Sequence, residues 1–184
     1  MSVSRYLRDG LREVLGPSVR ARGYRGTNPT WRKHNDLGDV AVINVQSSAF
    51  NDPDDGTCVV NLGVAPRPWI EGAIPALGLA PVSSADLKPN DCLWSLRLHA
   101  QTSAAPEDER WWAYQDRPSA VRVAEAIVAA LESEWFGVLD ELLTREGMGR
   151  RLLDGDPGFA HLEDRTRQIA AFLHQMDPPP EPSR

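Results

Sequence analysis

Hydrophobic and polar residues follow two different periods along this chain, and the changes of period predict the order of its elements. Near the N-terminus the apolar residues recur at helical spacing, which predicts an amphipathic helix. Its apolar positions are Leu7, Leu11, Val14 and Leu15. Ser4 is the expected N-cap. Gly16-Pro17 is expected to end or kink the helix, because proline lacks the N–H that a helix interior needs.

The middle of the chain alternates apolar and polar residues at the period of strands. Turn residues such as Asp55-Gly56 separate the alternating stretches, as in hairpins. The expected strands cover residues 30–34, 40–48, 57–65 and 92–99, with a shorter one in 110–115. The Pro-rich residues 66–91 fit no regular strand, and a short helix is expected near 70–77.

Helical spacing returns after residue 118 and predicts a long helix over 119–142, with Pro118 just before it. Residues 147–155 predict one or two helical turns, and residues 157–176 a final helix. The order of elements predicts an α+β fold, an antiparallel sheet with the N-terminal and C-terminal helices packed on one face. We expect one α+β domain over residues 1–176. The Pro-rich tail 177–184 is expected to be disordered and dispensable for stability.

Alternation assigns one face of the sheet to the core, because residues two apart on a strand share a face. The residues assigned to the core are Ile43, Val45, Val60, Leu62, Trp94 and Leu96. The opposite face carries a group of polar residues, and Gly63 is expected to leave a depression among them. These candidate site residues are Asn44, Gln46, Asn61, Ser95, Arg97 and His99.

Two interpretations of the polar residues remain open. Antiparallel sheets often have one solvated face, and such faces are polar. Solvated strands, however, usually carry Lys, Glu or Thr, and asparagine is a poor strand residue. Amides donate and accept hydrogen bonds in defined directions, which favours a face that contacts a ligand or partner. Trp111 and Trp112 are adjacent, so one of them is expected on the polar side.

The same stretches carry a resemblance to a known family. The segments RGYRGTNPTWRK, VINVQSS, VVNLGV, CLWSLRL and RWW, in this order, resemble the bacterial family catalogued as domain of unknown function 4304. The resemblance extends from about residue 7 to residue 143, and residues 66–91 depart from it. It implies no activity, cofactor or partner. Its recurring positions fall on Gly23, Trp31, Gln46, Asn61, Gly63, Arg97, Trp111 and Trp112.

Charge and composition narrow the classes of partner. The net charge of −6 argues against bulk nucleic-acid binding. No apolar run reaches the roughly 18 residues of a membrane span, and no signal peptide is visible, so a cytoplasmic location is expected. Residues 1–35 carry eight Arg or Lys against two acids, whereas residues 36–116 carry four against twelve. The basic segment either contacts an acidic partner or complements the acidic middle of the same molecule.

Common catalytic and metal-binding signatures are missing from the sequence. It contains no P-loop, G-x-G-x-x-G, H-E-x-x-H or G-x-S-x-G motif. Cys58, Cys92, His34 and His99 lack the spacing of zinc ligands, and both cysteines are assigned to the core. We therefore expect no metal, no cofactor and no catalytic residue of a common class.

The hypothesis that best fits these patterns is a non-enzymatic binding module that uses the polar face, with a protein or a small anionic ligand as partner. A defence or toxin-neutralising setting is a general expectation for such a protein and rests on no particular residue. The alternative is an enzyme acting on a small anionic substrate. In that case Arg97 would clamp the anion and His99 would serve as acid or base.

Overall fold

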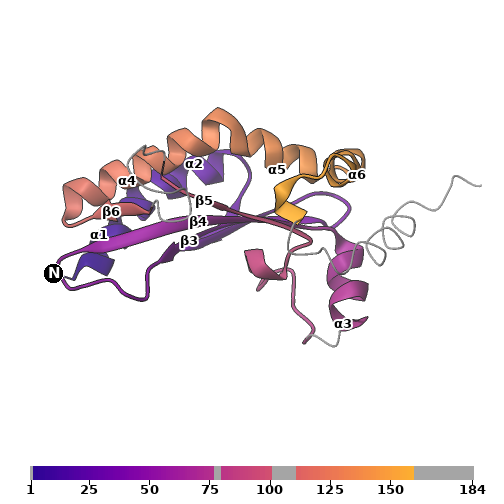
Figure 1. Cartoon of the computed structure of the whole chain (residues 1–184), viewed down its shortest axis with the longest axis horizontal. Helices are drawn as coiled ribbons and strands as arrows, with labels where there is room; N and C mark the ends of the chain where they lie inside the picture. Colours follow the sequence, from indigo (N-terminus) through magenta and orange to yellow (C-terminus); the bar gives the residue numbers. More distant parts are fainter. Residues whose placement is uncertain (1, 77–79, 101–110, 160–184) are drawn as a thin grey trace, which may run out of the picture.

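A six-stranded antiparallel sheet carries a layer of helices on one face (Figure 1). This architecture is seen in a computed structural model, which describes residues 2–76, 80–100 and 111–159. It confirms the predicted α+β class. Most of the expected final helix over 157–176, and all of the tail 177–184, lie outside the described residues.

The strands follow one another across the sheet in chain order, from β1 to β5, with β6 paired to β4. β5 pairs with residues 60–64 of β4 and β6 with residues 56–58, so the two strands lie end to end along one edge of β4. β1 was not predicted, because three residues are too few to show alternation. The strands are β1 (Arg25–Thr27), β2 (Thr30–His34), β3 (Val40–Ser47), β4 (Gly56–Ala65), β5 (Trp94–Leu98) and β6 (Trp112–Tyr114).

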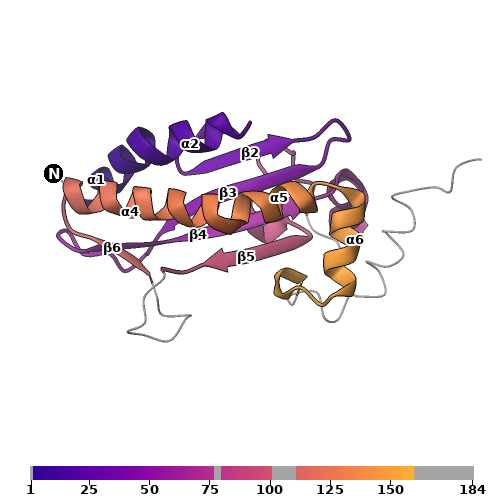
Figure 2. The same ribbon diagram turned by 90° about the horizontal axis from the view of Figure 1, so that it is seen from above.

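Two long helical segments run side by side across the sheet, and a shorter helix crosses the end of the layer (Figure 2). The first consists of α1 (Val3–Gly10), a π-helical turn (Leu11–Leu15) and α2 (Gly16–Ala21). The second consists of α4 (Arg117–Ala130), a π-helical turn (Leu131–Trp135) and α5 (Phe136–Leu142). The crossing helix is α6 (Arg145–Leu153).

The first helical segment does not end at Gly16-Pro17, which excludes one of the two expected outcomes, and its regular α-helical winding is interrupted just before the proline. The wider π-helical turn before Gly16 accommodates the proline ring, and Pro17 lies in the first turn of α2, where its missing N–H is not needed. One row of buried residues continues along the whole segment and holds it against the core. The row is Val3, Leu7, Leu11, Leu15 and Val19.

Other predicted boundaries shift by a few residues. The first helix begins at Val3 after Ser2, and not after Ser4. Pro118 lies in the first turn of α4 and not before it, because Asp116 is the N-cap and accepts a hydrogen bond from the backbone N–H of Ser119.

The face assigned to the core packs against the helices. Ile43, Val45, Val60, Leu62 and Trp94 are buried, whereas Leu96 on β5 is only partly buried. The two helical segments meet closely at Gly10, where a Cβ atom would lie 2.8 Å from the carbonyl oxygen of Ala120. Glycine therefore allows an approach that any larger residue would obstruct.

The opposite face of the sheet is partly covered by the segment between β4 and β5 (Figure 1). This segment contains a π-helical turn (Trp69–Ala73), α3 (Ile74–Ala76) and a 3-10 turn (Pro89–Asp91), which agrees with the expected short helix as far as the described residues reach. Arg32 fastens it to the sheet by donating two hydrogen bonds to the Leu87 carbonyl, at 2.9 and 2.7 Å. The described residues of this segment, 66–76 and 80–91, thus act as a second cover.

This cover corrects two sequence assignments. Gly63 leaves no depression, because a Cβ there would lie 2.7 Å from the sulfur of Cys92 and 2.9 Å from the Cα of Pro89. Cys92 is buried as expected, but it lies against Gly63 on the second face and not in the helix-covered core.

Candidate functional site

Polar side chains form a hydrogen-bonded row across three neighbouring strands. The register places Asn61 of β4 between Asn44 of β3 and Arg97 of β5. The Nδ2 of Asn61 donates to Gln46 Oε1 at 2.9 Å and lies 3.5 Å from Asn44 Oδ1. Its Oδ1 accepts from Arg97 Nε at 3.1 Å. The Nδ2 of Asn44 in turn donates to Thr30 Oγ1 on β2, at 2.8 Å.

The row is graded from a buried centre to exposed ends. Asn61 is 8% exposed, Asn44 is half-buried, and Gln46 and Arg97 are exposed. Because Asn61 donates toward one side and accepts from the other, its amide orientation is determined by its neighbours. The buried amide therefore holds the Nε edge of an exposed guanidinium in one place.

The structure separates the two adjacent tryptophans. Trp112 pairs with Cys58 and is buried on the helix-covered face. Trp111 is half-buried on the other side, where the Arg97 guanidinium carbon lies 6.0 Å from its ring centroid. This is the outer limit of a cation–π contact. Arg97 is thus held by an amide at one edge and bordered by an aromatic ring.

A pocket of about 290 Å³ opens beside this row. Asn61, Ser95 and Arg97 contribute one side, and Pro89 and Asn90 of the covering segment contribute the other. Pro89 and Asn90 were not predicted as site residues, and nor was Thr30. No sequence signal pointed to Pro89 or Asn90, because the path of residues 66–91 has no period.

His99 is not brought into this pocket. It is half-buried beyond the end of β5, and its Nδ1 is sheltered without a hydrogen-bond partner in the part of the chain that the structure describes. Over the same residues, no carboxylate lies within ion-pair distance of Arg97. The structure thus brings Arg97 together with amides and Trp111, and leaves His99 apart.

The two cysteines have no features of nucleophiles. Burial raises the pKa of the Cys58 thiol to about 12 and raises that of Cys92 well above its ordinary value. Thiolates are the reactive form, so both groups are inert near neutral pH. Across residues 2–76, 80–100 and 111–159, no three His, Cys, Asp or Glu side chains come together as metal ligands would.

Fold and site together define an α+β protein whose antiparallel sheet presents an amide-supported arginine on the face away from the helices. The chain belongs to the family described as domain of unknown function (DUF4304), whose model matches residues 15–141. No curated protein and no solved structure matches the chain. Among the described residues, none of the helices has the length and apolarity to cross a membrane.

Proposed function

We propose that this protein is a non-enzymatic binding module and that it recognises an anionic group of a partner protein with its polar face. The polar face consists of Asn44, Gln46, Asn61, Arg97 and Trp111. The observation that carries the proposal is the fixed guanidinium of Arg97, held at Nε by the buried amide of Asn61. An arginine held in place loses less conformational entropy on binding than a free one.

The composition of the polar face suits a protein partner. Arginine and tryptophan are enriched among the residues that contribute most to protein–protein binding. Here both are partly or fully accessible, and they are adjacent. The exposed Gln46 adds a polar group at the other end of the row. These features support a contact surface centred on Arg97, with the amide side chains of the polar face around it.

A second candidate is an enzyme for a small anionic substrate, and the pocket of about 290 Å³ at Arg97 is the observation that favours it. The pocket is at the lower end of the usual size of small-molecule sites. The candidate acid or base, His99, does not line it. We therefore place binding before catalysis. A bacterial cytoplasmic setting, with a defence or toxin-neutralising role, belongs to the same proposal, and the role rests on no particular residue.

The test is affinity purification of partners from the organism that encodes the chain. Three tagged proteins are compared: the unaltered chain, Arg97→Ala, and Arg122→Ala. Arg122 is an exposed arginine on α4, in the helical layer, and serves as the matched control. We expect one or more proteins to be retained by the unaltered chain and by Arg122→Ala, and to be lost with Arg97→Ala.

Two further measurements separate the outcomes. Circular dichroism must show that Arg97→Ala is folded, since unfolding would make Arg97 a structural residue. Calorimetric titration with phosphate and acetate tests the second candidate, because a small-anion site would bind these ions without a protein. Equal retention of partners by a folded Arg97→Ala variant would remove the polar face as the binding site.

A further inference from the structure

Strand β3 is longer than its neighbour β2, so part of the outer edge of β3 extends past the hairpin formed by β1 and β2. β4 pairs with β3 over residues 40–47, whereas β2 pairs only with residues 40–44. The next residue, Val45, donates its backbone N–H to the Pro29 carbonyl at 2.9 Å. Beyond this bond the β1–β2 hairpin turns at residues 28–29 and no longer runs beside β3.

The backbone groups of this edge can be assigned by alternation. The N–H of Ser48 donates to the Thr57 carbonyl on β4, so even-numbered residues of this stretch direct their groups toward β4. Val45 and Ser47 direct theirs to the opposite, outer side. Pro29 has no N–H to return to the Val45 carbonyl. Within the described part of the chain, no backbone partner is found for the outer groups of Ser47. The edge thus offers two acceptors and one donor.

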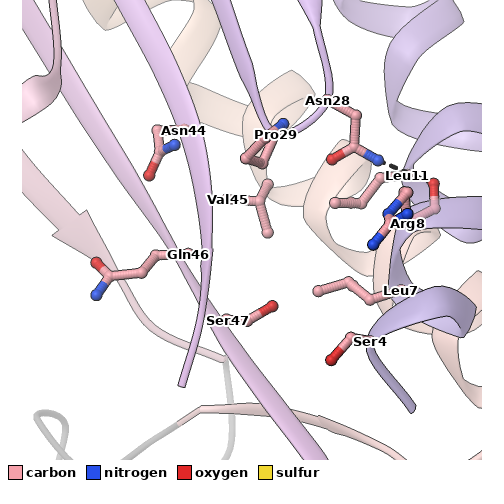
Figure 3. A pocket seen from close by; sticks show the side chains of 10 residues that line it. All are labelled: Ser4, Leu7, Arg8, Leu11, Asn28, Pro29, Asn44, Val45, Gln46 and Ser47. Carbon is pink, nitrogen blue, oxygen red and sulfur yellow. Dashed lines mark hydrogen bonds between the residues drawn. The ribbon is translucent and has the colours of Figure 1, made fainter. Parts of the chain in front are cut away.

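A groove of about 400 Å³ lies along this edge, between β3 and α1 (Figure 3). Leu7 of α1 and Leu11 of the π-helical turn form one wall, and Val45 and Pro29 form the other. Asn44 and Gln46 point to the far side of the strand, toward the polar face (Figure 3). The groove thus has a buried apolar base of Leu7, Leu11 and Val45 and is bordered by a strand edge. Asn44 and Gln46 line it as well, although their side chains point away from it.

The charge at the rim of the groove is positive. Arg8 is exposed on the α1 wall, and residues 1–35 carry eight Arg or Lys against two acids. Among the ion pairs of the described residues, none joins an Arg or Lys of residues 1–35 to an acid of residues 36–116. Arg5 and Arg12 lie by Asp9 of the same helix, and Lys33 pairs with Asp140. The rim thus keeps a positive charge that suits an acidic partner.

We infer that the open edge of β3 takes up an extended acidic segment of a partner protein as an added strand. The backbone of this segment would pair with Val45 and Ser47, one apolar side chain would enter the groove between Leu7 and Val45, and an acidic residue would face Arg8. Strand addition of this kind obtains affinity from main-chain hydrogen bonds and selectivity from alternate side chains. The inference is independent of the proposed role of Arg97.

The experiment selects from a displayed library of ten-residue peptides in extended, alternating patterns of acidic and apolar residues. Enriched peptides are synthesised, and their affinities are measured by fluorescence anisotropy. The key variant is Ser47→Pro, which removes the outward N–H at an edge position where proline is tolerated. Ser47→Ala, which keeps the N–H, is the matched control. We expect at least tenfold weaker binding to Ser47→Pro, and unchanged binding to Ser47→Ala.

Two more arms complete the test. Peptides N-methylated at alternate residues should lose binding when the methylated nitrogens face β3, and should keep it when those nitrogens face away. Arg8→Glu should weaken the binding of acidic peptides at least tenfold. Failure to enrich any peptide, or equal binding to folded Ser47→Pro, overturns the inference. Sedimentation that shows a dimer broken by Ser47→Pro would also overturn it, because a second copy of the chain would then occupy the edge.

Discussion

Arg145, at the start of α6, forms a buried ion pair with Asp39, at the end of the β2–β3 turn, with 2.8 Å between Nη2 and Oδ1. The Asp39 side chain is 3% exposed. Its carboxylate also accepts the backbone N–H of Arg67 at 2.8 Å and the Nδ2 of Asn35 at 2.9 Å. The Asp39 carboxylate therefore joins three parts of the chain: the β2–β3 turn, the segment that follows β4, and α6.

The first prediction concerns this carboxylate. Asp39→Ala leaves Arg145 without its partner in a sheltered position, and breaking a buried pair in this way typically costs about 3–5 kcal/mol. Urea unfolding measures the loss. The control is Asp140→Ala, which removes the more exposed pair with Lys33 and should cost about 1 kcal/mol or less. Equal losses in the two variants would contradict the structural role of Asp39.

The second prediction concerns the core face of the sheet. Leu62 is fully buried in the middle of β4. Leu62→Ala should lower the free energy of unfolding by about 2–5 kcal/mol, because it removes buried methyl groups and leaves a cavity. Chemical denaturation gives the value. A loss below about 0.5 kcal/mol would show that the assignment of faces is wrong.

The third prediction tests whether binding of the partner depends on the positive charge of Arg97. In Asn61→Asp, a carboxylate takes the place of the amide oxygen and pairs with the Arg97 guanidinium directly. We expect this variant to stay folded and to lose partner proteins in the same purification, because the added negative charge repels an anionic group. Retention of the partners by Asn61→Asp would argue against an anion at Arg97.

The fourth prediction is a dependence of stability on pH through Asp156. Burial acts to raise the pKa of this carboxyl, yet hydrogen bonds from Trp94 Nε1, Arg151 and the Gly158 N–H hold it below its ordinary value. A depressed pKa contributes stability that is present above the unfolded value of about 3.9 and is lost as the pH falls through the folded value. The stability gap between the unaltered chain and Asp156→Asn should therefore shrink between about pH 5 and pH 2. A constant gap in denaturation at these pH values would contradict this role.

The fifth prediction concerns the thiols. Cys58 and Cys92 are buried, and burial raises the pKa of both. A thiol reagent at pH 8 should label neither group in the native protein and both after unfolding in guanidinium chloride. Rapid labelling of the native protein would mean that one of the two sites opens to solvent.

The core face and the polar face could be predicted because β3 and β4 have two different sides. Ile43, Val45, Val60 and Leu62 share one parity, whereas Asn44, Gln46 and Asn61 share the other, so a single period assigns the two faces. The segment over residues 66–91 could not be predicted in this way. It is held by isolated contacts, such as Arg32 to the Leu87 carbonyl and Trp69 Nε1 to the Asp91 carbonyl at 2.8 Å. Contacts of this kind leave no repeat in a sequence.

The candidate site shows the same limit. Asn44, Gln46, Asn61 and Arg97 share a face by parity alone, and the structure joins them by hydrogen bonds. Parity required Trp111 and Trp112 to lie on opposite sides, but only the pairing of Trp112 with Cys58 shows which of them is near Arg97. Pro89 and Asn90 reach the pocket from a segment that the period does not describe.

The close approach of α1 and α4 at Gly10 also bears on how the chain is made. Strands β1 to β5 follow chain order, so each can pair with its predecessor soon after synthesis. The cover of their apolar face comes partly from α4 and α5, which the ribosome delivers after every strand. A growing chain released before residue 117 would carry a sheet with part of its apolar side open to water, and such species are prone to aggregate. Until residues 117–142 have been synthesised, the apolar face of the sheet therefore lacks the part of its cover that α4 and α5 supply.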